Sequence, residues 1–107
     1  MNLALCQIAM SDNENENLER QLSAPRQAAL HGADLIVYPE LQLHRFFPQY
    51  EGRDVSDKLL TADHPIIRQF QDACRENRIM AAPNFYLREP SGCFDATLLI
   101  GGDGGLV

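Results

Sequence analysis

The chain has 107 residues, of which 45% are hydrophobic and 22% charged, and its formal net charge is −6. This length accommodates at most one domain, and the composition is typical of a soluble globular chain. The negative charge argues against a nucleic-acid partner, which would need a basic patch, and no apolar run approaches the roughly 18 residues of a membrane helix. The chain starts directly with a strand-like pattern and without a basic leader, so we expect a cytoplasmic protein with no signal peptide.

Three cysteines, Cys6, Cys74 and Cys93, are scattered along the chain. They form no Cys-x-x-Cys pair and no cysteine–histidine spacing of the kind that binds a metal. Cys6 and Cys74 lie in apolar patterns, which predicts reduced core residues in a cytoplasmic protein. The sequence therefore indicates no metal site.

The N-terminal part of the chain predicts a strand followed by a helix. Apolar residues dominate Leu3–Met10, which indicates the strand. Good N-cap residues at 11–13, two glutamates after them and apolar residues every three or four positions predict the helix. Pro25 should kink this helix or start a second segment capped by Ser23, and Gly32 should end it.

The second strand is predicted over Asp34–Leu41, and it lacks polar alternation. A strand of this kind is buried on both faces, as in the centre of an α/β sheet. A long loop from Gln42 to about Ala62 follows it. The next segment predicts a helix with Asp63 as its cap and a proline in its first turn.

Two further strands are predicted over Ile79–Leu87 and Phe94–Gly101, which gives the element order β-α-β-α-β-β. The glycine-rich end of the chain contains the dipeptide Asp103–Gly104, a strong hairpin signal. The apolar pair Leu106–Val107 would then begin a returning strand. We therefore expect the 107 residues to be the front part of a longer protein, with a frayed natural C-terminus as the alternative.

Glu40 is the residue that most strongly suggests chemistry. It follows an apolar run and would share one strand face with Ile36 and Tyr38. Open α/β sheets place their sites at the carboxyl ends of strands, and a carboxylate partly removed from water has a raised pKa. Such a group can act as a base or acid near neutral pH. The alternatives are a solvated glutamate at a strand end and one that caps nearby backbone N–H groups.

Several stretches carry a resemblance to a known family. The stretches "LALCQIAM", "NL" at residues 17–18, "GADLIVYPEL" and "FDATLLIGGDGGLV" resemble the first part of the nitrilase (carbon–nitrogen hydrolase) superfamily. Among its subfamilies, "PELQLHRFFPQ" is most similar to the N-carbamoyl-D-amino acid amidohydrolases. Two positions depart from these patterns: Gln49 stands where a basic residue commonly follows the proline in that subfamily, and Asp95 stands where asparagine is common in the family.

The resemblance implies an α/β fold, the four-layer αββα sandwich, with residues 1–107 as the N-terminal part of one domain, about its first two fifths. It implies hydrolysis of amide or N-carbamoyl bonds through a cysteine thioester, with Glu40 as the general base. The family's lysine, which stabilises the oxyanion, would follow just after Val107, and the catalytic cysteine would lie far beyond it. None of the cysteines present matches that nucleophile, so the segment alone should be inactive.

The same resemblance implies a small-molecule amide or carbamoyl substrate and a homo-oligomer, with no metal, organic cofactor, nucleic acid or membrane partner. Phe46, Phe47 and Pro48 would wall the substrate pocket or, as the alternative, fill the space between sheet and helices. His44 and Tyr50 are open between contact with the substrate and roles at the surface or at a subunit contact. A non-catalytic α/β binding or interaction module of the same fold is the alternative to a hydrolase.

Overall fold

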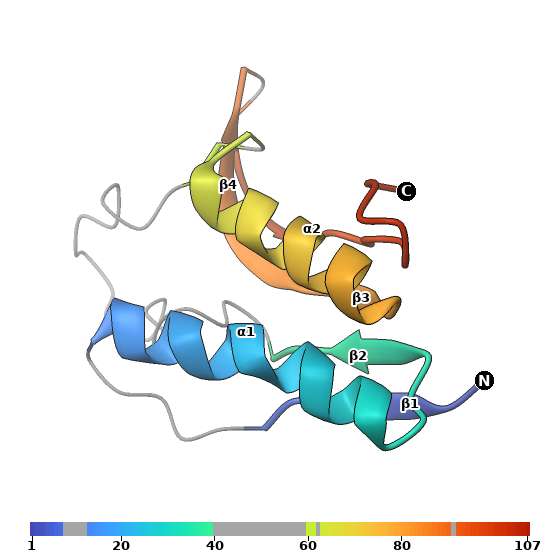
Figure 1. Ribbon diagram of the computed structural model, residues 1–107. Coiled ribbons are helices and arrows are strands. Elements are labelled where there is room, and N and C mark those ends of the chain that lie inside the picture. The colour runs from blue at the N-terminus through green and yellow to red at the C-terminus, as the bar shows by residue number, and fades with distance from the viewer. Residues whose placement is uncertain (8–12, 40–59, 62, 91) are drawn as a thin grey trace.

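The computed structural model describes residues 1–7, 13–39, 60–61, 63–90 and 92–107. Its elements follow the order β-α-β-α-β-β-β (Figure 1). The predicted alternation is therefore confirmed through the second helix, and the third predicted strand is divided into β3 (Met80–Ala82) and β4 (Asn84–Glu89). The division falls at Pro83, which has no N–H group to donate to a strand ladder.

A three-stranded parallel sheet with the order β1-β2-β3 lies at the centre of the fold. Strand β1 spans Leu3–Leu5 and strand β2 spans Leu35–Val37. Both are shorter than predicted, and parts of the predicted strands, residues 8–10 and 40–41, lie outside the described residues. The central position of β2 is confirmed, because it pairs with β1 on one side and with β3 on the other.

Helix α1 spans Glu14–Leu30 as one continuous helix, although Pro25 lies inside it. The predicted second segment capped by Ser23 is therefore wrong, since the Ser23 hydroxyl donates to a helix carbonyl three residues earlier. Asn13 is the N-cap, as predicted for one of three candidates, and its side chain accepts a hydrogen bond from a first-turn N–H. Gly32 follows the helix with a φ of +83°, which confirms its predicted role as the terminating glycine.

Helix α2 spans Pro65–Asn77. Its N-cap is His64 and not the predicted Asp63, because the His64 Nδ1 accepts a hydrogen bond of 3.1 Å from the N–H of Ile66. The physical reason is the proline at the first helical position. A residue that precedes proline is held in an extended conformation, which is the conformation an N-cap residue adopts.

The two helices cover the same face of the parallel sheet. The register places Ala4, Ile36 and Ala81 side by side on that face, where Ile36 and Ala81 join the buried core. Two right-handed crossovers that proceed in one direction put both helices on one side. On the opposite face Leu3 and Leu5 are 58% and 65% exposed. The described residues thus supply two of the four predicted layers, and the predicted burial of the central strand on both faces is not met within them.

Strand β5 (Gly92–Thr97) pairs antiparallel with β4. Beyond β5 the chain reaches the parallel sheet, since Ala81 and Ile100 exchange two backbone hydrogen bonds of 3.0 and 2.8 Å. The predicted terminal hairpin is confirmed, because the Val107 N–H donates to the Leu99 carbonyl at 2.9 Å.

The turn of this hairpin lies against helix α2. The Gln71 side chain donates to the Gly104 carbonyl at 3.1 Å. Gly104 has a φ of +87°, and a Cβ atom there would lie 2.9 Å from the Gln71 carbonyl oxygen. Both the backbone conformation and the close approach to α2 therefore favour glycine at this position.

Cys6 and Cys74 are buried, with 7% and 0% of their surface exposed, which confirms their prediction as core residues. Burial raises the pKa of the Cys74 thiol to about 11 and also raises the pKa of Cys6. The side chain of Cys93 lies outside the described part of the structure. Within the described ranges, no helix combines the length and the apolar character needed to cross a bilayer.

Candidate functional site

The structure does not place the residues for which the sequence predicts catalysis or substrate contact. Glu40, Phe46, Phe47 and Pro48 all lie outside the described residues, as does His44. What the structure shows is the strand that leads to Glu40 and the pocket at its end. Tyr38, two residues before Glu40 in the sequence, lines this pocket.

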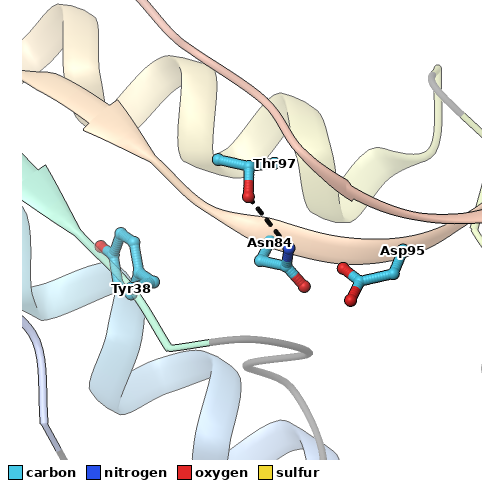
Figure 2. A pocket seen from close by; sticks show the side chains of 4 residues that line it. All are labelled: Tyr38, Asn84, Asp95 and Thr97. Carbon is cyan, nitrogen blue, oxygen red and sulfur yellow. Dashed lines mark hydrogen bonds between the residues drawn. The ribbon is translucent and has the colours of Figure 1, made fainter.

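The pocket has a volume of about 380 Å³, and Tyr38, Asn84, Asp95 and Thr97 line it (Figure 2). Tyr38 directly follows β2, and Asn84 follows β3 with only Pro83 between. These two strands are parallel neighbours, so their carboxyl ends meet at one edge of the sheet. Ligands of open α/β sheets bind at that edge. The local topology therefore places the pocket where the sequence predicted a site.

The remaining wall of the pocket comes from the antiparallel pair β4 and β5. Asp95 and Thr97 are two residues apart on β5, so their side chains project from the same face of the strand. Asn84 stands opposite Thr97 in the ladder, and its Nδ2 donates to the Thr97 Oγ1 at 3.0 Å. Figure 2 shows the Asn84 amide and the Asp95 carboxylate turned toward the same space.

Tyr38 is held in place by the helices. Its ring stands edge-on to Phe70 of α2, with ring centroids 5.4 Å apart. Its hydroxyl donates to the backbone carbonyl of Gln21 in α1 at 2.7 Å and points away from the other lining residues (Figure 2). Burial raises the pKa of Tyr38 far above its usual value, so the phenol stays protonated and remains a donor.

Pro25 explains why this hydrogen bond exists. In an α-helix the carbonyl of residue 21 accepts from the N–H of residue 25, and proline has none. The Tyr38 hydroxyl donates to that same carbonyl. The residue that lines the pocket therefore also supplies the donor that the proline withholds from the helix.

The charge of the described lining residues comes from Asp95 alone. Within the described ranges Asp95 forms no salt bridge, and the salt bridges there join Glu16 to Arg20 and Asp72 to Arg75. Also within those ranges, no three histidine, cysteine or acidic side chains gather in a group that could hold a metal ion. The described pocket offers a carboxylate, an amide and a hydroxyl, which can orient a ligand that carries N–H groups.

The sequence of the chain matches the profile described as carbon-nitrogen hydrolase over residues 2–107. The chain belongs to the carbon–nitrogen hydrolase family. This confirms the resemblance to the nitrilase superfamily that the sequence indicated. A curated relative, the citrullinase of Francisella tularensis subsp. tularensis, is 29% identical over 106 residues. That match covers 98% of this chain and 37% of the relative, so the chain spans well under half of the relative's length.

Two solved structures show the corresponding carbon–nitrogen hydrolase fold. An amidase from Nesterenkonia sp. matches with a TM-score of 0.76 at 22% identity, over 100% of this chain and 40% of the amidase. A carbon–nitrogen hydrolase from Helicobacter pylori G27 matches with a TM-score of 0.85 at 16% identity, over 97% of this chain and 36% of that protein. The predicted α/β fold of the nitrilase type is thereby confirmed for the chain.

None of the four residues that line this pocket is among the site residues that the sequence predicts. Tyr38 lies in the apolar run that predicts a buried strand, and it is both buried and part of the wall. Asn84 and Thr97 lie inside the predicted strands 79–87 and 94–101. The available signal was the Pro83–Asn84 step, which interrupts an apolar run directly after a parallel strand. Asp95 stands out in the sequence only as a departure from the family pattern.

Proposed function

We propose that the chain is the N-terminal part of a single-domain hydrolase of non-peptide carbon–nitrogen bonds, acting on amide or N-carbamoyl substrates. The observation that carries the proposal is the match of residues 2–107 to the carbon–nitrogen hydrolase family. The pocket at the carboxyl edge of the parallel sheet supports it, since Tyr38 lines that pocket and Glu40 follows two residues later. We also propose that the full-length protein forms a homo-oligomer and is located in the cytoplasm.

The similar proteins support this class of substrate. One is a citrullinase and another an amidase. A structure of the Nesterenkonia amidase records the addition of acrylamide at its active-site cysteine. A cysteine nucleophile is thus part of that amidase, and we propose one for the full-length protein here, meaning this chain with whatever its gene encodes around it.

In the proposed mechanism Glu40 takes the proton of a cysteine thiol encoded beyond Val107. The thiolate attacks the carbonyl carbon, and a lysine just after Val107 stabilises the oxyanion, a contribution of about 3 kcal/mol per donor. The protonated Glu40 gives this proton to the departing nitrogen, so ammonia leaves and the carboxylate is restored. Glu40 then takes a proton from the water that attacks the thioester and returns it to the cysteine sulfur as the acid product leaves. Phe46, Phe47 and Pro48 would keep bulk water from the carboxylate.

The test replaces Glu40 in the full-length protein. Glu40→Gln preserves the shape of the side chain but cannot accept the proton, so ammonia release from amides and N-carbamoyl amino acids should fall by at least about a hundredfold. Glu76→Gln, which neutralises an exposed glutamate of α2, is the matched control and should leave the rate unchanged.

Two outcomes would contradict the proposal. Near-normal turnover by the Glu40→Gln protein would remove Glu40 from the mechanism. A full-length protein without ammonia release, in which no cysteine forms an acyl adduct detectable by mass spectrometry, would favour the non-catalytic binding module.

A further inference from the structure

We propose that Asp95 is a specificity-determining residue, which binds a cationic amine at the end of the substrate remote from the bond that is cleaved. This inference rests on the proposed function, because it names the class of amide or ureido compound that the pocket accepts. That class is a compound with a carbonyl–nitrogen bond at one end and an ammonium group at the other.

The first support is the position of the carboxylate. Asp95 projects from β5 into the same pocket as Tyr38, the residue that continues the chain toward Glu40. It also stands opposite Tyr86 in the ladder, two steps along from the Asn84–Thr97 pair and therefore on the same face. A ligand seated at the carboxyl edge of the parallel sheet would therefore face the Asp95 carboxylate, which projects from the β4–β5 pair.

The second support is the chemistry of the lining. An ionised carboxylate only accepts hydrogen bonds, so it favours a ligand group with N–H donors and a positive charge. The Asn84 Nδ2 donates to Thr97, and no hydrogen bond or salt bridge joins Asp95 side-chain oxygens to any other described residue. The net charge of −6 over the chain acts in the same direction, since it favours approach of a cation over an anion.

The third support is the choice of residue. Asparagine has the same shape as aspartate and would present both a donor and an acceptor to the pocket. Aspartate at this position repels a carboxylate and attracts an ammonium group. Because Asp95 is exposed in the described structure, we expect an effect of the size of a solvent-screened ion pair.

The test uses two amides of equal length in the full-length protein. 5-Aminopentanamide ends in an ammonium group, and hexanamide ends in a methyl group at the same place. Wild-type protein should prefer 5-aminopentanamide in kcat/KM. Asp95→Asn should reduce this preference about fivefold, mainly through KM, while the rate with hexanamide changes little.

Two further variants make the result specific. Asp72→Asn removes the same charge from α2, outside the pocket lining, and should leave the preference unchanged. Asp95→Lys should shift the preference toward glutaramate, the chain of similar length that ends in a carboxylate. An unchanged ratio of the two amide rates in Asp95→Asn would overturn the proposal.

A binding measurement separates this proposal from the proposed function. Isothermal titration calorimetry with 5-aminopentanamide in the Glu40→Gln protein needs no turnover, and adding Asp95→Asn should weaken binding about fivefold. If wild type releases ammonia from neither amide but the binding difference is seen, the hydrolase is wrong and the amine site stands. Equal binding with and without Asp95→Asn, or no saturable binding, would overturn the amine site.

Discussion

The hydrogen bond between the Tyr38 hydroxyl and the Gln21 carbonyl offers a sharp test of how Pro25 is accommodated. Tyr38→Phe removes the hydroxyl and keeps the ring that packs on Phe70. Pro25→Ala restores the backbone N–H that a helix normally directs at residue 21. We therefore expect the effect of Tyr38→Phe to depend on which residue occupies position 25.

The size of the coupling can be worked from the structure. Tyr38 is 5% exposed and Gln21 is 0% exposed, so the hydrogen bond of 2.7 Å is buried. Deleting a donor at a buried carbonyl costs about 1–3 kcal/mol of folding free energy. With alanine at position 25 the helix supplies a replacement donor, and the cost should drop to about 0.5–1 kcal/mol. The expected coupling is about 1 kcal/mol, which double-mutant cycles resolve.

Native-state hydrogen exchange of the α1 amides in the full-length protein is the appropriate assay, because it reports local opening free energies. Four proteins complete the cycle: wild type, the two single variants and the double variant. The reasoning would be refuted if Tyr38→Phe lowered the protection of α1 equally with proline and with alanine at position 25.

The remaining predictions concern the core, the terminal turn and the open sheet face. Burial raises the pKa of Cys74 from 9.0 to about 11. The neutral thiol's contribution to stability is therefore present below pH about 9 and is lost as the pH rises toward 11. The free energy of unfolding in urea should decline across this range, and the decline should be smaller in Cys74→Ala. Gly104→Ala should destabilise the protein by about 1–2 kcal/mol, since φ is +87° and the added Cβ would meet the Gln71 carbonyl. Thermal denaturation measures the effect, with Gly102→Ala as the control, because a Cβ there would have no contact closer than 3.5 Å. Equal losses of stability in the two variants would count against the argument. The isolated 107 residues should release no ammonia from an N-carbamoyl amino acid and should self-associate in sedimentation, because Leu5 is 65% exposed on an apolar sheet face; a monodisperse monomer would contradict this packing argument.

Periodicity and capping residues predicted most of the element order. The apolar stripe of α1, the uninterrupted apolar run of β2 and the glycine-rich hairpin each follow from local chain preferences. The errors have local causes that depend on tertiary contacts. Pro25 stays inside one helix, where a hydroxyl from another element donates to the carbonyl freed by the proline. His64 replaces Asp63 as the cap because the following proline fixes its backbone.

The candidate site was less accessible to sequence reasoning than the fold. The position of a site at the end of β2 follows from the rule for parallel sheets, and Tyr38 lies there. Asn84 and Thr97 face the pocket only because β4 and β5 pair in one particular register. A shift of one residue would place the two side chains on opposite faces of the strand pair, and single-sequence patterns do not fix that register.

Pro83 has a consequence for the shape of the protein as well as for the strand count. It divides what the sequence predicts as one straight strand, and the chain changes direction between β3 and β4 (Figure 1). The concave surface lined by Asn84 therefore begins at a bend in the backbone. A residue with an N–H at position 83 could extend the ladder and straighten this bend, which would flatten the surface without altering any side chain that lines it.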